Sequence, residues 1–361
     1  MPLAAFEPWI HRGPAILLAG MVALFICSRI LAIILPRQSD AIGLRAVAFF
    51  LPIAAVSLVS ALMGRPEIAV AVVFGTSVGA MTTVVGFIAV SEPVVAGPPR
   101  WRRLWPFLLA AALLVFVIGF KGTFSWHHAV ALATEGLLLF TLWNDSGETA
   151  VTTAAVNTAA TPPNETLSYA TDGATPSRTL ARSLLLPFEL ILVAILLWLA
   201  AWFVTRGTVR TAPMLRGMST SGLAGSVVSL SMVLPMMFGS WRLGVGGRGW
   251  ALVTTQIGVV LLNLCALLPV LILLPYAAAN FPAIAHWAGD SMLWHEGLPK
   301  LVIFPPPMWR IDNVLLIVVG VFLLPVAIGK WSLSREEGMV LIAAYFFYLT
   351  ATLVSGLTPI H

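Results

Sequence analysis

The stretch LPIAAVSLVSALMGRPEIAVAVVFGTS, residues 51–77, decides the fold. It holds two apolar runs that, with the residues flanking them, are long enough for membrane helices, and the turn at Gly64 and Arg65 joins them. Pro52 lies inside the first run, where a proline removes one backbone hydrogen bond of a helix. Hydroxyl residues follow it, among them Ser57 in the first run and Thr76 in the second. The stretch predicts two consecutive membrane helices, the first of them broken at Pro52.

A second stretch, LPMMFGSWRLGVGGRGWALVTTQIGVVLLN, residues 234–263, repeats this arrangement about half a chain later. Pro235 follows a leucine as Pro52 does, and a turn with glycine and arginine again leads into an apolar helix with a central glycine. Polar residues lie before and within this second copy: Ser229, Ser231, Gln256 and Asn263. Two matching pairs of helices predict an internal repeat.

The composition places both copies in a membrane. Of 361 residues, 59% are hydrophobic and 10% are charged, against roughly 25% charged in a typical soluble domain. At about 20 residues per span, ten transmembrane helices are predicted, at 14–35, 41–63, 67–90, 105–120, 128–143, 184–205, 219–240, 249–275, 313–330 and 338–357. A small excess of Lys and Arg in alternate connections favours an N-terminus outside the membrane. We expect a multi-pass protein of the cell membrane, in a bacterium the inner membrane.

The spans fall into two groups of five. Residues 144–183 are rich in Thr, Ala, Ser and Pro and predict a flexible polar linker between a first repeat, residues 1–143, and a second, residues 184–361. An odd number of spans per repeat makes the second copy enter the membrane from the opposite side. Such inverted repeats build many secondary transporters, in which broken helices meet at the midplane around a substrate cavity. The predicted fold is therefore an all-α membrane protein of two inverted five-helix repeats.

Several classes of function find no support in the sequence. The basic residues are scattered rather than gathered, so nucleic acid is not an expected partner and the lipid bilayer is. Cys27 and Cys265 lie in apolar runs and are expected to be buried core residues. No pattern typical of an enzyme, a phosphate-binding loop or a zinc site occurs, and no cofactor is expected.

At these motifs the chain resembles the calcium/cation antiporter superfamily, the sodium/calcium exchangers and their relatives. The residues that carry the resemblance are the two quoted stretches and the segments WRIDNVLLIVVG, residues 309–320, and GKWSLSREEGMVLIAAYFFYL, residues 329–349. The resemblance implies cation antiport by rocking of the first and sixth spans against the repeat core. It also implies a paired cation ligand, an acidic residue after the Leu-Pro of each repeat.

This sequence lacks both implied acids. Ile53 and Met236 stand at those positions, so a calcium site of the family type cannot be assembled. Glu189, in the sixth span, is the best candidate for a titrating or cation-binding group, and Arg29 is its natural counter-charge, which leaves a structural ion pair as the competing interpretation. Glu67 and Glu135 are expected to be structural.

Uncharged polar residues are the remaining candidates for an ion or substrate pathway. They are Ser57, Thr76, Ser77, Ser229, Ser231, Gln256 and Asn263. Such residues could line a midplane cavity, or they could join helices by hydrogen bonds.

Two functions stay open: antiport of a small cation through an atypical site, or a transport-inactive scaffold that holds a membrane protein partner. A hydrated midplane cavity would favour transport. A dry core packed with Phe49, Phe50, Ile53, Met232 and Met236 would favour the scaffold.

Overall fold

The computed structural model describes residues 13–34, 42–95, 99–141, 176–215, 218–244, 249–280, 302–303 and 309–357. Most of them are helical, and the predicted all-α membrane fold is confirmed. The helices of the first half are α2 (Gly13–Ile34), α3 (Ile42–Leu62), α4 (Pro66–Gly79), the π-helical turn η3 (Ala80–Val84), α5 (Val85–Ser91), α6 (Pro99–Gly119) and a helix over residues 126–141.

The second half begins with the long helix α8 and ends with α17. Its helices are α8 (Pro176–Thr211), the 3-10 turn η4 (Ala212–Met214), α9 (Thr220–Leu223), the π-helical turn η5 (Ala224–Val228), α10 (Ser229–Gly244), α11 (Gly249–Leu262), the π-helical turn η6 (Asn263–Leu267), α12 (Leu268–Asn280), the π-helical turn η8 (Trp309–Asn313), α15 (Val314–Phe322), α16 (Leu324–Ile328) and α17 (Arg335–Leu357). Two short strands, β1 (Thr123–Phe124) and β2 (Val302–Ile303), pair antiparallel.

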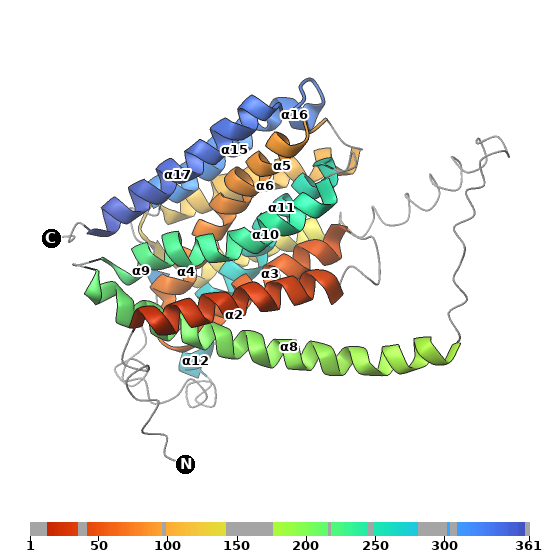
Figure 1. Ribbon diagram of the computed structural model, residues 1–361. Helices are drawn as coiled ribbons and strands as arrows, with labels where there is room; N and C mark the ends of the chain where they lie inside the picture. The colour runs from red at the N-terminus through yellow and green to blue at the C-terminus, as the bar shows by residue number, and fades with distance from the viewer. Residues whose placement is uncertain are drawn as a thin grey trace, which may run out of the picture.

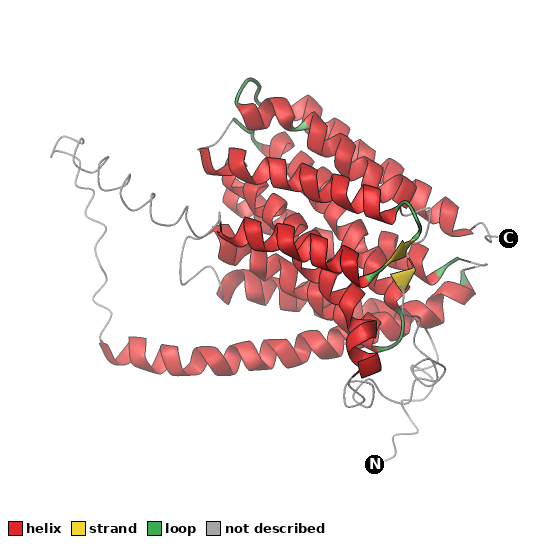
Figure 2. Cartoon of the chain, turned by 180° about the vertical axis from the view of Figure 1, so that it is seen from behind, coloured by secondary structure: helices red, strands yellow, loops and turns green. Residues whose placement is uncertain are grey.

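Each of the ten predicted spans overlaps a described helix. Eight helical stretches in the described part of the chain are long and apolar enough to cross a membrane. The fourth span has a shorter apolar helix, Leu104–Gly119, and the fifth is the helix over residues 126–141. Figure 2 shows how little of the described chain is strand or loop.

The helices form three groups in space (Figure 1). Helices α2 and α8 lie along one side of the molecule, α15 and α17 lie along the opposite side, and α4, α5, α10 and α11 lie between them. The central helix α4, with η3 and most of α5, is buried along its length. The residues quoted first in the sequence therefore form the centre of the protein.

Helices α2 and α8 run antiparallel and touch through glycines. A Cβ atom on Gly20 would lie 2.8 Å from the backbone nitrogen of Val204, and one on Gly207 would lie 2.5 Å from that of Leu17. Such close approach is typical of helix pairs in membranes, where small residues let two backbones pack together. The opposite directions of these two first helices of the repeats agree with an inverted repeat.

The structure corrects the prediction that Pro52 and Pro235 break their helices. Helix α3 continues through Pro52 and α10 continues through Pro235. A proline removes one hydrogen bond, and packing within a helical membrane protein tolerates that loss without ending the helix. Irregular backbone lies at other positions: in η5, just before α10, and in the next helix of each repeat. There, π-helical turns begin at Ala80 and at Asn263, which are matching positions of the two copies.

The end of the predicted linker also differs from the structure. Residues 142–175 lie outside the described residues, but residues 176–183 belong to α8, which begins at Pro176. Ser, Thr and Arg in this stretch are compatible with a helix that extends an apolar span. The sixth span is therefore longer than the apolar run that identified it.

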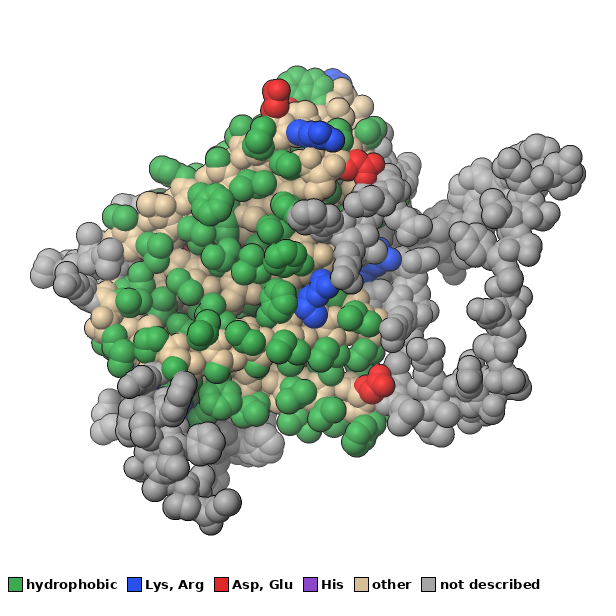
Figure 3. All heavy atoms as spheres, viewed as in Figure 1, with side chains coloured by type: hydrophobic (Ala, Val, Ile, Leu, Met, Phe, Trp, Pro, Cys, Tyr) green, Lys and Arg blue, Asp and Glu red, His purple; other side chains and the backbone are tan. Residues whose placement is uncertain are grey.

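The surface agrees with a membrane environment. Large apolar side chains are exposed along α8 and α17, for example Ile191, Ile195 and Phe347. Figure 3 shows one face covered mostly by hydrophobic side chains, with a few charged side chains toward its upper and right sides. An apolar surface of this extent is what lipid tails contact.

Candidate functional site

Two neighbouring hydroxyl groups lie at the middle of α4. Thr76 and Ser77 are fully buried, and each donates a hydrogen bond to a carbonyl of its own helix, Thr76 Oγ1 to Val72 O at 2.6 Å and Ser77 Oγ to Val73 O at 2.7 Å. A hydroxyl group that donates its one proton in this way keeps its oxygen lone pairs for other partners. The two side chains therefore present acceptor oxygens inside the bundle.

Asn263 reaches these oxygens from the second repeat. It is the first residue of η6, it is fully buried, and its Nδ2 lies 3.0 Å from Ser77 Oγ and 3.4 Å from Thr76 Oγ1. The side chain thus donates hydrogen bonds to α4, while its Oδ1 is buried and has no hydrogen-bond partner. A π-helical turn at this point is notable, because such turns occur frequently at functional sites.

Gln256 lies on the same helix, two turns before Asn263. It is fully buried, and neither its Oε1 nor its Nε2 has a hydrogen-bond partner. Leaving a buried polar group unpaired costs about 1–3 kcal/mol. Positions seven apart on a helix share a face, so Gln256 and Asn263 define one polar stripe along α11 and η6.

Helix α4 crosses the second repeat at Gly75, the residue before Thr76. A Cβ atom on Gly75 would lie 2.3 Å from Gly225 O and 2.4 Å from Ser229 Oγ. Only glycine fits there, because the backbone of η5 occupies the space. Ser229 therefore lies against Gly75, and its own Oγ donates to Ala224 O at 3.0 Å.

The two positions of the missing acids are apolar and buried. Ile53 and Met236 are 0% and 1% exposed and belong to one core cluster, together with the buried Phe49 and Met232 and the partly buried Phe50. Among the described residues, no group of three or more His, Cys, Asp or Glu side chains could hold a metal ion. A calcium site of the family type is absent from this part of the molecule.

Three predicted residues lie apart from this cluster. Ser57 Oγ donates to Ala69 O at 3.3 Å between α3 and α4, and Ser231 Oγ donates to Val228 O within its own helix. Glu189, the leading candidate, is exposed on α8. Most of the neighbouring side chains on α8, including Ile191 and Leu192, are exposed as well, so this end of the helix faces outward rather than toward α4.

Arg29 is half-buried and lies near α10 rather than beside Glu189. Its Nη1 is 4.0 Å from the point that a Cβ atom on Gly239 would occupy, next to the ring of Phe49. No contact between Arg29 and Glu189 is found among the described residues. The predicted counter-charge relation is not supported by this placement.

The structure adds one acid that the sequence reasoning did not select. Asp312, in η8, is 2% exposed, and its side chain forms a hydrogen bond with Tyr348 of α17. The ring of Tyr348 stacks on that of Tyr345, with centroids 5.7 Å apart. Asp312 is the acid of the Trp-Arg-Ile-Asp segment that carried part of the family resemblance. Its place in that segment was the sequence feature that could have identified it.

The next residue, Asn313, fixes η8 against α6. With its carboxamide oriented to satisfy both atoms, its nitrogen donates to Ala112 O at 3.2 Å and its oxygen accepts from Phe116 N at 2.7 Å. These two backbone groups are the pair that a regular helix would join to each other. The side chain therefore bridges one turn of α6 and holds η8, with Asp312, in a fixed place.

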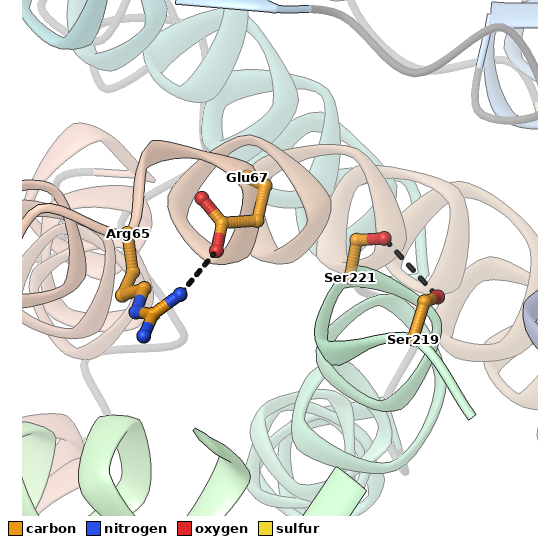
Figure 4. A network of polar contacts seen from close by, with 4 residues as sticks. All are labelled: Arg65, Glu67, Ser219 and Ser221. Carbon is orange, nitrogen blue, oxygen red and sulfur yellow. Dashed lines mark hydrogen bonds and ion pairs between the residues drawn. The ribbon is translucent and has the colours of Figure 1, made fainter. Parts of the chain in front are cut away.

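The other acids in or near spans have different surroundings. Glu67 pairs with Arg65 at 3.7 Å, at the start of α4, beside the start of α9 where Ser219 and Ser221 meet (Figure 4). Both side chains are partly exposed, as expected for an interfacial pair. The carboxyl oxygens of Glu135 are buried without a partner, and the next residue, Gly136, packs on Cys265 of η6.

Comparison with known proteins supports the predicted resemblance. Residues 14–143 match the family described as sodium/calcium exchanger protein. No curated protein matches the sequence. The resemblance to the calcium/cation antiporter superfamily, first seen in the repeat motifs, is thereby confirmed over the first half of the chain.

Solved structures extend the likeness to almost the whole chain. A structure of the sodium-calcium exchanger NCX_Mj is 15% identical, with a TM-score of 0.56, and the match covers 94% of this chain and 99% of that one. The H+/Ca2+ exchanger CAX is 13% identical, with a TM-score of 0.62 and coverage of 96% and 86%. Native YfkE is 14% identical, with a TM-score of 0.61 and coverage of 98% and 93%. At these identities the likeness shows the fold.

Proposed function

We propose that this chain, which has the fold of the calcium/cation antiporter superfamily, is a cation antiporter whose ion site is built from uncharged oxygen atoms. The site consists of Thr76, Ser77 and Asn263, and Gln256 lines the approach to it. The cargo is a cation of single charge. The observation that carries the proposal is the buried Oδ1 of Asn263, which has no partner although both hydroxyl groups beside it are engaged.

The charge of the cargo follows from the ligands. A divalent cation sheds its water only when several oxygens, carboxylates among them, replace it. Ile53 and Met236 remove the two carboxylates, and hydroxyl and amide oxygens remain. Neutral oxygens in an unwound or widened helix are the kind of ligand that coordinates sodium ions in other transporters.

The test is cation flux into proteoliposomes that contain the purified protein. We expect uptake of labelled sodium or potassium against a gradient of the counter-ion, and no uptake of calcium. Asn263→Leu removes the free oxygen at nearly constant volume and should abolish uptake. The matched control is Ser231→Ala, whose hydroxyl bonds within its own helix and should leave uptake unchanged.

One result would overturn the proposal: calcium uptake by the native protein, or sodium and potassium uptake that Asn263→Leu leaves intact. An unfolded variant is recognised by its elution from a size-exclusion column, and Asn263→Gln then serves as the second variant, because it keeps the amide but displaces its oxygen.

The scaffold function is supported by a different observation, the burial of Ile53, Met232 and Met236 in the apolar core. A scaffold would move no cation at all and would copurify with a membrane protein partner. The same flux assay separates the two functions, because a scaffold gives the signal of empty vesicles for every cation. The cell membrane as location and the N-terminus outside remain part of the proposal.

A further inference from the structure

We propose that Asp312 is the proton-binding group of this protein and that Tyr348 couples its protonation to the ion site through the carbonyl oxygen of Gly225. The proposal makes the proton the counter-ion. It rests on the proposed function only for the identity of the transported cation. Proton binding at Asp312 itself is a separate property, which can be measured without transport.

Asp312 lies in a site where an ionised carboxylate has little compensation. It is 2% exposed and lies within a helical stretch long and apolar enough to cross a membrane. Its turn, η8, packs against α4, α6, α15 and α17. Residues 104–119 of α6 and all of α15 contain no ionisable side chain, and α4 contributes only Glu67, which pairs with Arg65.

The ionisable groups that face Asp312 are the two tyrosines of α17, Tyr348 in direct contact and Tyr345 stacked on it. The remaining charged residues of α17, Arg335, Glu336 and Glu337, lie in its first turn, more than two turns before Tyr345. Among the described residues no cationic side chain is found against Asp312, and a buried acid in a membrane span is a candidate for binding a proton or a cation.

Tyr348 can signal the state of Asp312 because a hydroxyl group has only one proton to donate. Its hydroxyl lies 3.3 Å from Gly225 O and also forms hydrogen bonds with the side chains of Asp312 and Thr352. When Asp312 carries a proton, the acid donates to Tyr348, and Tyr348 donates to Gly225 O. When Asp312 is ionised, Tyr348 donates to the carboxylate, and Gly225 O loses its donor.

Gly225 O connects this switch to the ion site. It lies at the crossing with α4, 2.3 Å from where a Cβ atom of Gly75 would be, and Gly75 directly precedes Thr76 and Ser77. The freed carbonyl belongs to the π-helical turn η5, which packs against α4 at the residue before Thr76 and Ser77. Ionised Asp312 then supplies one negative charge that balances the charge of a monovalent cation.

The resulting exchange is balanced. The proton leaves the carboxyl oxygen of Asp312 for water as one cation enters, and it returns when the cation leaves, so that the site holds either one proton or one cation. No covalent bond other than O–H forms or breaks, and no electron is transferred. Tyr348 keeps its own proton throughout and only changes the acceptor.

The first test is infrared difference spectroscopy of the purified protein in lipid nanodiscs, recorded between acid and alkaline pH. Among the carbonyl bands of protonated carboxylic acids that the native protein shows at acid pH, one should be missing from Asp312→Asn and shifted in Tyr348→Phe, because one hydrogen bond is lost. Glu67→Gln is the control and should keep the band. A band that persists unshifted in both Asp312→Asn and Tyr348→Phe would overturn the proposal.

The second test is the pH dependence of labelled sodium or potassium binding to the same samples. A single linked proton changes the apparent affinity by up to about tenfold per pH unit, and Asp312→Asn should make the affinity independent of pH. Cation binding with an unchanged pH dependence in Asp312→Asn contradicts this inference and leaves the proposed function standing. An infrared band assigned to Asp312 without any cation binding contradicts the proposed function and leaves the proton site standing.

Discussion

Single residues at the crossing of the two repeats decide how closely the helices approach. Gly75 and Gly225 face each other there, but their surroundings differ. A Cβ atom on Gly75 would meet Gly225 O at 2.3 Å, whereas the nearest atom to a Cβ on Gly225 is Ala71 O, at 3.7 Å. One glycine is required for contact and the other has room for a methyl group.

This asymmetry predicts opposite results for two equivalent substitutions. Gly75→Ala should destabilise the protein by about 1–3 kcal/mol, because an overpacked core must shift its backbone. Gly225→Ala should retain nearly native stability. The measurement is the temperature at which half of the detergent-solubilised protein loses its monodisperse elution peak. Equal melting temperatures for the two variants would show that the crossing is looser than described.

At the scale of whole elements, helices α2 and α8 contact each other through glycines. The pair joins the two repeats along one side of the molecule (Figure 1), and its contact depends on Gly13, Gly20 and Gly207. The family resemblance assigns rocking to these two helices, and their outward faces are exposed apolar side chains such as Leu18 and Ile195. The glycines let the backbones of the two helices approach closely.

Gly207→Ala should loosen this pair without disturbing α4. Its Cβ would lie 2.5–2.8 Å from the N, Cα and Cβ atoms of Leu17, so the two helices must separate. We expect faster hydrogen exchange of backbone amides in α2 and α8, measured by mass spectrometry, and unchanged exchange in α4. The control is Gly320→Ala, whose Cβ would meet only Leu109 Cδ1, at 3.4 Å. Faster exchange in α4 would mean that the pair and the core move as one body.

At the scale of the whole molecule, both halves contribute to one apolar core where relatives are expected to hold a cation. Ile53 comes from the first repeat and Met236 from the second, and both are buried in the same cluster. The all-α membrane fold therefore persists although the acids implied by the resemblance are missing. Fold and function are separable in this way because the fold rests on many packed residues and the ion site on a few.

The double variant Ile53→Glu plus Met236→Glu tests this separation. Two unpaired acids in a dry core should lower the melting temperature in the absence of metal, since buried charges without partners are costly. Calcium should raise the melting temperature of the double variant and leave that of the native protein unchanged. The single variants are the controls and should show no calcium response. A native protein that calcium stabilises would contradict the uncharged ion site.

The sequence by itself determined the membrane fold, the two copies and the loss of the acids, because run length, proline spacing and residue identity are local properties. Asn263, Thr76 and Ser77 could be selected in the same way, as polar residues in apolar runs. Only the tertiary structure decided that Asn263 bonds Ser77, that Asp312 is buried against Tyr348, and that Glu189 faces outward.

The sequence does not show which side of a membrane helix faces the protein, because lipid tails are as apolar as the protein core. In a soluble helix, the polar face shows which side is outside. In α8 both faces are apolar, so the sequence does not show how the helix is rotated about its axis. The direction of Glu189 depends on which face of α8 packs against α2 through the glycines. The position of a helix in the sequence can thus be predicted from neighbouring residues. Its rotation about its own axis is set by close contacts with segments far apart in the chain.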